Sequence, residues 1–201
     1  MVAAIILAAG ESTRMGRPKA LLPDSGGRPF VARLVRTFAD AGITQILVVA
    51  GSQRPAIDAA LAAEVSAGSC SVVTNPAPER GQLSSLWVGL DALNANPPEA
   101  VLVTLVDIPM VASTTVAQVI RAWEDRRPPI ARPAYRGRHG HPVLFDWSLV
   151  NELRGAPLNE GARAVVHQHE ADLINVAVED EGCVVDVDTP DDYAKVLETF
   201  R

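Results

Sequence analysis

The stretch VAAIILAAGESTRMGRPK, residues 2–19, is the part of the sequence on which the fold assignment depends. Its apolar beginning, Val2 to Leu7, is typical of a buried β-strand. The small residues Ala8 to Gly10 follow, and they allow a ligand to approach the backbone closely. Their N–H groups could point at a phosphate, as rows of backbone amides do in other phosphate-binding loops.

Two basic side chains add positive charge to this loop. Arg14 supplies a planar guanidinium group and Lys19 a compact ammonium group. The pattern therefore indicates a loop that binds a triphosphate. Because neither G-x-x-x-x-G-K-[ST] nor G-x-G-x-x-G occurs in it, an exposed strand-to-helix loop with solvated basic residues is the alternative.

Composition excludes several classes of protein. The length of 201 residues fits one domain, residues 1–201. The net charge of −6 argues against a nucleic-acid partner, because phosphates repel an acidic surface. No apolar run reaches the about 18 residues of a membrane span, and the apolar start lacks basic leader residues. We therefore expect no membrane partner and a cytoplasmic location. Cys70 and Cys183 lack C-x-x-C spacing, so two free thiols are expected.

Strand and helix patterns alternate through the first two thirds of the chain. This alternation predicts an α/β fold with a Rossmann-like, doubly wound and mostly parallel sheet. Ser113 or Thr114 is expected to cap the fourth helix. The predicted strands cover residues 2–7, 45–50, 71–74 and 100–106, and the predicted helices cover 29–41, 55–65, 83–93 and 113–124.

The pattern changes after the fourth helix. Two predicted strands, residues 130–135 and 142–145, flank a turn at 136–141 and predict a small β-hairpin insertion. The prediction continues with short helices near 147–153 and 161–169 and with strands at 173–178 and 183–187. It ends with a last helix, which begins at the segment TPDD (residues 189–192).

Carboxylates follow two of the predicted strands. Asp107 ends the most apolar strand, while Asp186 and Asp188 end the 183–187 strand with both side chains on one face. Ligands of doubly wound sheets bind beyond the carboxyl ends of strands, so these groups and the first loop are expected to meet. Such carboxylates suit Mg²⁺ that bridges phosphates. As alternatives, Asp107 is a turn residue and Asp188 a helix cap, although Thr189 is an equally good cap.

A second polar cluster consists of Asn75, Gly81, Ser84 and Ser85 at a loop–helix junction. These residues could contact the base or ribose of a nucleotide. A capped helix with Gly81 as its turn residue is the alternative.

The histidines give a weaker signal. His139 and His141 would need a third ligand nearby to bind zinc, and the sequence shows none. A hairpin tip with His141 packed behind Pro142 is therefore favoured over a zinc site. A contact of these histidines with substrate is the remaining alternative. His167 and His169 fall on a predicted surface helix and are expected to be solvated.

Six motifs in order resemble those of nucleotidyltransferases that couple nucleoside triphosphates to small phosphorylated acceptors. The later motifs are similar to those of one branch, the molybdenum cofactor cytidylyltransferases. The motifs are LAAGESTRMGRPK (7–19), NP with GQLSSL (75–76, 81–86), LVDIP (105–109), GHPVLF (140–145), GAR (161–163) and DVDTPDDY (186–193).

The resemblance implies a fold of the nucleotide-diphospho-sugar transferase type and a reaction. CTP and the phosphate of molybdopterin, or of the molybdenum cofactor, would give the cytosine dinucleotide cofactor and pyrophosphate. Lys19 and Arg14 would hold the triphosphate with the backbone of Leu7, Ala8, Ala9 and Gly10. Asn75, Gly81, Ser84 and Ser85 would also bind the nucleotide, and Asp107 and Asp188 would bind Mg²⁺. The catalytic residues would be Lys19, Arg14 and Asp107. His141 and Asp186 would bind the acceptor.

Resemblance also favours cytosine over guanine. Ala9 and Pro18 stand where the guanylyltransferase branch carries Gly and Asp, whereas Ile108 departs from the Gln expected in the cytidylyl branch. Alternatives are a guanylyltransferase, a sugar- or polyol-phosphate nucleotidyltransferase of the same fold, and a chaperone that delivers the cofactor to a molybdenum hydroxylase apo-enzyme. Such an apo-enzyme is also a candidate partner of the cytidylyltransferase.

Overall fold

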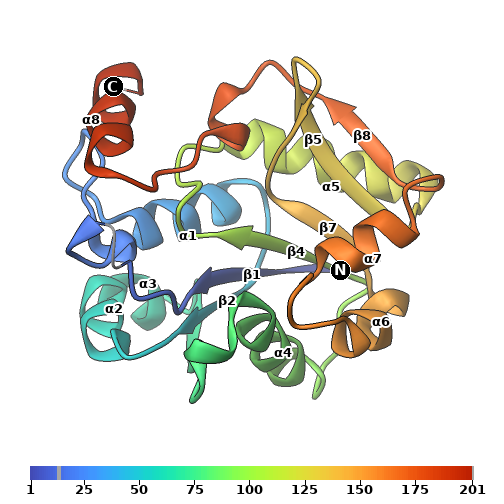
Figure 1. Ribbon diagram of the computed structural model, residues 1–201, viewed down its shortest axis with the longest axis horizontal. Helices are drawn as coiled ribbons and strands as arrows, with labels where there is room; N and C mark the ends of the chain where they lie inside the picture. The colour runs from blue at the N-terminus through green and yellow to red at the C-terminus, as the bar shows by residue number, and fades with distance from the viewer. Residues whose placement is uncertain (13–14, 201) are drawn as a thin grey trace.

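A mixed β-sheet forms the centre of the computed structural model, which describes residues 1–12 and 15–200 (Figure 1). Within these residues eight strands lie in the order β3-β2-β1-β4-β7-β5-β6, and β8 pairs with β5. The strands are β1 (Val2–Ala8), β2 (Gln45–Ala50), β3 (Ser71–Thr74), β4 (Ala100–Leu105), β5 (Ile130–Tyr135), β6 (Arg138–His139), β7 (Val143–Asp146) and β8 (Ile174–Ala177).

The sheet is mostly parallel, as the alternating pattern predicted. Strands β3, β2, β1 and β4 are parallel neighbours, and β5 runs parallel to β8. Strand β1 has β2 on one side and β4 on the other, so the chain changes its direction of winding beside β1. Ligands of such sheets bind at this switch point, beyond the carboxyl ends of the strands.

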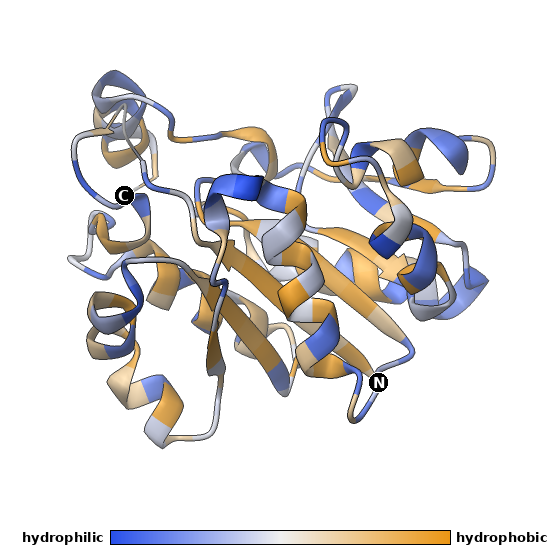
Figure 2. Cartoon of the chain, turned by 60° about the horizontal axis from the view of Figure 1, so that its bottom comes forward, coloured by the Kyte–Doolittle hydropathy of each residue, from blue (hydrophilic) through white to orange (hydrophobic). Residues whose placement is uncertain are grey.

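Helices cover both faces of the sheet, and the apolar residues gather in the strands between them (Figures 1 and 2). Helices α1, α2 and α5 contribute buried residues to one face, and α4, α6 and α7 to the other. The helices are α1 (Phe30–Asp40), α2 (Arg54–Ala60), α3 (Ala62–Ser66), α4 (Gln82–Leu93), α5 (Ser113–Arg126), α6 (Val150–Gly155), α7 (Arg163–Gln168) and α8 (Pro190–Thr199).

Strand β1 is buried along its whole length. Ala4 and Ile6 pack with the α1 and α5 side of the core, whereas Ala3 and Ile5 pack with the α4 side. Because successive side chains of a strand point to opposite faces, burial on both faces requires an uninterrupted apolar run. The run ends where the chain leaves the sheet for the loop before Lys19.

The predicted hairpin differs from the observed one. Strand β5 turns back at Arg136 and Gly137, both with positive φ, into the short strand β6. The chain then enters β7, which lies antiparallel between β4 and β5. The hairpin insertion is therefore partly wrong: β7 belongs to the central sheet, because its apolar residues Leu144 and Phe145 are buried there.

The predicted strand at 183–187 is wrong. Residues Glu181–Val184 form the 3-10 helix η5, and residues 185–188 pair with no strand in the described part of the chain. The segment from residue 180 to 188, called the strap below, bonds to loops instead of to a sheet edge. The Asp180 carboxylate accepts from Ala112 N–H at 2.9 Å and from Thr115 Oγ1 at 2.7 Å. This contact draws the strap toward α5.

Three smaller predictions also change. Helix α5 begins after Ala112, and neither Ser113 nor Thr114 caps it; the Asp180 carboxylate instead bonds to Ala112 N–H and to the Thr115 hydroxyl at the start of this helix. The predicted helix at 55–65 divides into α2 and α3 at Leu61, whose side chain is fully buried. His169 is half-buried with Nε2 2.7 Å from Glu152, so the prediction that it is solvated is wrong, whereas His167 is exposed.

A third small core joins the two ends of the chain. It contains Met15 and Leu22 from the first loop, Phe30 from α1, Met110 from the loop after β4, and Val187 and Val196 from the strap and α8. Tyr193 packs edge-on against Phe30, and its hydroxyl donates to the carbonyl of Pro23 at 2.8 Å. Figure 1 accordingly shows α8 beside the first loop.

Candidate active site

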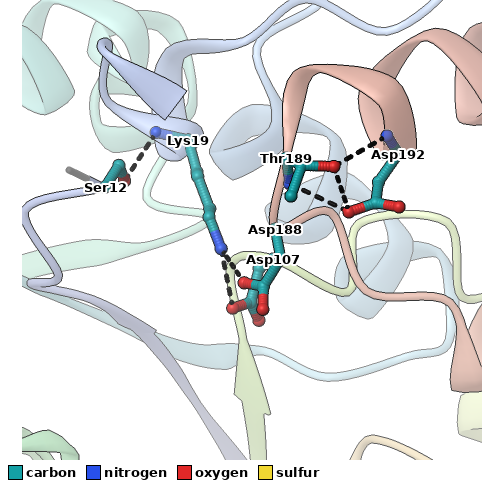
Figure 3. Close-up of polar contacts among 6 residues, drawn as sticks. All are labelled: Ser12, Lys19, Asp107, Asp188, Thr189 and Asp192. Carbon is teal, nitrogen blue, oxygen red and sulfur yellow. Dashed lines mark hydrogen bonds and ion pairs between the residues drawn. The ribbon is translucent and has the colours of Figure 1, made fainter. Parts of the chain in front are cut away.

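Lys19, Asp107 and Asp188 meet at the switch point of the sheet (Figure 3). Lys19 begins the 3-10 helix η2 (Lys19–Leu21) after β1, Asp107 follows β4, and Asp188 precedes α8. The Lys19 ammonium lies 3.3 Å from Asp107 Oδ2 and 2.5 Å from Asp188 Oδ1. Its side chain is 11% exposed, so this positive charge is held at a largely buried point between two carboxylates.

The first loop fixes the backbone of Lys19. Ser12 has a φ of 53°, a left-handed conformation that is uncommon for a side-chain-bearing residue. Its hydroxyl accepts the backbone N–H of Lys19 at 3.0 Å, and its carbonyl accepts the N–H of Met15 at 2.9 Å. Ser12 thus closes the loop on itself and sets the direction in which Lys19 leaves it (Figure 3).

Asp107 and Asp188 are positioned by backbone and cap contacts. The carbonyl of Asp107 accepts the N–H of Val187 at 2.8 Å, which ties the strap to the end of β4. Thr189 and Asp192 form a capping box at the start of α8. Of the two caps that the sequence left open, Thr189 is the one observed, and Asp188 faces Lys19 instead (Figure 3).

The carboxylates fit a divalent cation. Asp107 Oδ1 is buried and has no hydrogen-bond partner among the described residues, although Oδ2 bonds to Lys19. A buried carboxylate oxygen is costly to leave unbonded, so it points to a ligand. Residues 1–12 and 15–200 provide no cluster of three His, Cys, Asp or Glu side chains that could hold a metal ion. Two carboxylates with substrate oxygens suit Mg²⁺, which rarely occupies a closed protein cage.

A cleft of about 340 Å³ opens beside this triad and is called the first cleft. Of the predicted site residues, eight line it: Leu7, Ala9, Gly10, Lys19, Gly81, Ser85, Asp107 and Asp188. Ala8 is buried on the far side of β1, in the core with α1. Arg14 lies outside the described residues.

Asn75 and Ser84 support the wall of the first cleft from behind. The Asn75 amide donates to Ser84 Oγ and Ser85 Oγ, both at 2.9 Å, and its carbonyl oxygen accepts the N–H of Ala77. Both Asn75 and Ser84 are buried and bonded within the protein. The predicted polar cluster therefore divides: Asn75 and Ser84 hold the turn, while Gly81 and Ser85 reach the cleft.

A second cleft of about 590 Å³ adjoins the first and shares Leu7, Gln82 and Leu105 with it. The shared residues make the two clefts neighbours along the sheet edge. Its apolar lining includes Leu83, Leu86, Val103, Val143, Phe145 and Val166, and its polar lining is Arg132, His139, His141, Glu160, Arg163 and His167. Predicted His141 thus lies in this cleft, whereas Asp186 is exposed and lines neither cleft among the described residues.

Several lining residues were missed by inspection of the sequence. Ser12 and Gln82 line the first cleft, and Arg132 and Arg163 the second. Ser12, Gln82 and Arg163 each fall inside a motif that carried the family resemblance, so the motifs offered a signal. Arg132 carried a weaker signal, because it belongs to a local cluster of basic residues with Arg136 and Arg138. Its place beside His139 depends on the turn between β5 and β6.

Comparison with known proteins gives the class. The sequence matches the MobA-like NTP transferase domain over residues 4–173, and the chain belongs to this family of nucleotidyltransferases. The match ends before Asp188, so the strap and α8 lie beyond it.

Three relatives extend almost to the full chain. Nicotine blue oxidoreductase of Paenarthrobacter nicotinovorans is 31% identical over 98% of this chain and 96% of its own. Molybdenum cofactor cytidylyltransferase of Escherichia coli is 25% identical over 98% and 95%. Rv0371c of Mycobacterium tuberculosis H37Rv aligns with a TM-score of 0.83 and 30% identity, covering 98% of this chain and 97% of that one. A second structure of Rv0371c contains manganese and aligns with a TM-score of 0.77.

In the part of the chain that the structure describes, no helix combines the length and the apolar character that crossing a membrane requires.

Proposed function

We propose that the protein transfers CMP from CTP to the phosphate of molybdopterin, giving the cytosine dinucleotide form of the cofactor and pyrophosphate. The observation that carries this proposal is the placement of Lys19 between Asp107 and Asp188 at the switch point, beside a cleft lined by Ala9 and Gly10. This combination suits a metal–triphosphate complex, because it offers one ammonium for phosphate oxygens and two carboxylates for a cation.

The residues would act by positioning and electrostatics. An oxygen of the acceptor phosphate attacks the α-phosphorus, a new P–O bond forms, and the bond to the β-phosphate oxygen breaks to release pyrophosphate. The attacking phosphate is already ionised, so the step needs no general base. Lys19 would hold phosphate oxygens while Gly10 and Ser12 line the space beside them. Mg²⁺ held by Asp107 and Asp188 would supply charge neutralisation on the phosphoryl oxygens.

The second cleft supports the acceptor part of the proposal. It adjoins the first cleft at Gln82, and its lining combines apolar side chains with Arg132 and Arg163. A lining of this kind fits an anionic molecule with a flat apolar body. We place the pterin body there, so that its phosphate reaches the first cleft past Gln82.

Cytosine is proposed on the basis of Ala9 and Pro18. Ala9 lines the first cleft, and its methyl group would leave less room for a purine than a glycine would. A Cβ atom on Gly51 would lie 2.7 Å from the Ala9 carbonyl, so the backbone at Ala9 has no room to retreat. Ile108 is 7% exposed and lines neither cleft among the described residues, so the departure from the expected Gln does not alter the cleft wall.

An oxidoreductase activity is the second candidate, because the P. nicotinovorans relative covers nearly the whole chain at 31% identity. Hydride transfer from a nicotinamide cofactor would leave Asp107 and Asp188 without a function in binding the reacting group. The two candidates therefore differ in their dependence on these carboxylates.

A pyrophosphate-release assay tests the proposal. Purified protein would be mixed with reduced molybdopterin, Mg²⁺ and either CTP or GTP. We expect pyrophosphate only when CTP, acceptor and Mg²⁺ are all present, and slower release by Asp107→Asn at a limiting Mg²⁺ concentration. Faster turnover of GTP would overturn the choice of base. Oxidation of NADH or NADPH with nicotine blue, unchanged in Asp107→Asn and without pyrophosphate release, would overturn nucleotidyl transfer.

A further inference from the structure

The imidazole of His141 is fixed in the second cleft by a backbone carbonyl. His141 Nδ1 lies 3.4 Å from the carbonyl oxygen of Val103 in β4. A carbonyl oxygen can only accept a hydrogen bond, so Nδ1 carries the proton in this contact. Nε2 is then unprotonated in the neutral ring and exposes a lone pair.

The backbone of His141 is held as firmly as its ring. Its N–H donates to the carbonyl of Cys183 in the strap at 2.8 Å. The preceding Gly140 lies so close to the strap that a Cβ atom there would be 2.3 Å from the same carbonyl. His141 is therefore a preorganised group, and its ring need not rearrange when a ligand enters.

The neutral form of the ring is the favoured one. Burial lowers the pKa of His141, and this effect exceeds the opposing influence of the Val103 carbonyl and of the Asp107 charge. Nε2 has no protein hydrogen-bond partner among residues 1–12 and 15–200. A polar atom that lines a cleft in this state can accept a hydrogen bond from a ligand.

The second cleft has a positively charged part, formed by arginine side chains, and a hydrogen-bond-accepting part, formed by His141. Arg132 is half-buried and donates to Asn175 Oδ1 at 2.8 Å, with His139 Nε2 within 3.4 Å. Its guanidinium and that of Arg163 attract anionic groups, whereas the lone pair of His141 repels phosphate oxygens, which are themselves acceptors. The part of a ligand that contacts His141 must therefore donate.

We propose that His141 is a specificity-determining residue whose Nε2 accepts a hydrogen bond from an N–H group on the heterocyclic body of the acceptor substrate. This inference rests on the proposed function only in placing the acceptor in the second cleft. The contact orients the acceptor, since the donor edge faces His141 and the phosphate is directed past Gln82 toward Lys19. An acceptor without such a donor, for example a sugar phosphate that reaches only the arginines, is then disfavoured.

Three substitutions separate this role from a structural one. His141→Gln places an amide oxygen close to the former Nε2 position, His141→Asn keeps a donor for the Val103 carbonyl but does not reach the ligand, and His141→Phe removes both contacts. Binding of hydroxymethylpterin phosphate would be titrated by pterin fluorescence. Glycerol phosphate competition and CTP binding serve as controls, and a thermal unfolding curve verifies each variant.

We expect His141→Phe and His141→Asn to weaken hydroxymethylpterin phosphate binding about tenfold, the value of one hydrogen bond, with CTP affinity unchanged. His141→Gln should restore binding to within about threefold of wild type. Rescue by Asn and not by Gln, wild-type affinity in all three variants, or absence of hydroxymethylpterin phosphate binding to the wild type would each overturn the inference.

The proposed function fails in a different way. If the wild type releases no pyrophosphate but the binding pattern of the three variants is as expected, nucleotidyl transfer to molybdopterin is wrong while the role of His141 stands. If pyrophosphate release is normal and the molybdopterin KM is unchanged in every variant, only the role of His141 is wrong.

Discussion

Lys19 and Asp188 form an ion pair of 2.5 Å although 169 positions separate them in the chain. Asp107 completes the group at 3.3 Å from the same ammonium. The two carboxylate side chains are 26% and 32% exposed, so water and a bound cation can both reach them. Lys19 thus neutralises the carboxylate charge that a bound cation would neutralise during the proposed reaction.

Replacing Lys19 should separate catalysis from folding. Lys19→Met removes the ammonium from the phosphate site, so we expect pyrophosphate release to fall by about 100-fold or more. The protein should stay folded, although its melting temperature should fall, because the two carboxylates would then face each other without a cation between them. Lys19→Arg keeps the charge and should lose less activity. Wild-type turnover in Lys19→Met would contradict a role in binding the triphosphate.

The carboxylate pair predicts a metal dependence. Asp107→Asn and Asp188→Asn should each raise the Mg²⁺ concentration for half-maximal activity about tenfold or more, and EDTA should abolish activity of the wild type until Mg²⁺ or Mn²⁺ is restored. Asp191→Asn, an exposed residue in the first turn of α8, is the matched control. Equal metal dependence in the control and the two site variants would argue against metal binding here.

Close packing of the strap predicts a large effect of one methyl group. A Cβ atom on Gly182 would lie 2.1 Å from the carbonyl of Met110, so the strap must move in Gly182→Ala. We expect the free energy of unfolding to decrease by about 1–3 kcal/mol, measured by urea denaturation. Gly155→Ala, at the end of α6 with open space around it, should be neutral. Similar losses in both variants would show that the strap contact is not the cause.

Two buried thiols should be inert in the folded protein. Burial, with a smaller effect of Asp180, raises the pKa of Cys183 to about 11. Burial and the Glu64 charge raise the pKa of Cys70 to about 11 as well. Both thiols therefore stay protonated near pH 8, and a disulfide reagent such as DTNB should react only after denaturation, when two equivalents are consumed. Fast reaction of the native protein would contradict their burial.

Asp24 should make the fold sensitive to acid. Burial alone would raise its pKa, but hydrogen bonds from Arg28, Arg33 and Gly26 together lower it. Because the folded pKa lies below the unfolded value, Asp24 stabilises the protein fully above about pH 4, and this contribution is lost as the pH falls through the folded pKa. Asp24→Asn should therefore lower stability near neutral pH by about 2 kcal/mol and less in acid.

Thermal melts between pH 2 and pH 7 measure the Asp24 effect. Asp40→Asn, an exposed position at the end of α1, is the matched control. A stability difference between wild type and Asp24→Asn that stays constant with pH would rule out a contribution from the carboxylate charge.

The first half of the fold was predictable from local pattern. Strand β1 is buried on both faces, so its sequence is uniformly apolar, and the loop to Lys19 follows directly. Asp107 stood out because a carboxylate at the end of the apolar strand β4 is costly unless it is bonded. The Lys19 and Asp107 parts of the candidate site were therefore visible without a structure.

The strap was less predictable because its contacts are distant in sequence. The residues Cys183 to Val187 resemble a strand in sequence, but the backbone partners of Cys183 and Val187 are His141 and Asp107, which lie in loops and not at a sheet edge. Asp188 was correctly placed near Lys19, although for the wrong reason, since Asp186 does not share its face of a strand. Asn75 was equally ambiguous, because a buried amide that holds a turn and an exposed amide that contacts a base have the same sequence signal.

The third small core joins residues from the two ends of the chain, so the candidate active site is completed only late in translation. Lys19 leaves the ribosome early, while Asp188, 169 residues later, and the α8 residues that anchor it come almost last. At usual translation rates the nascent chain spends roughly ten to thirty seconds with Lys19 made and its partner carboxylate missing. A chain interrupted before residue 188 would retain the strands of the sheet but lack Asp188, and the proposed function predicts that such a product releases no pyrophosphate.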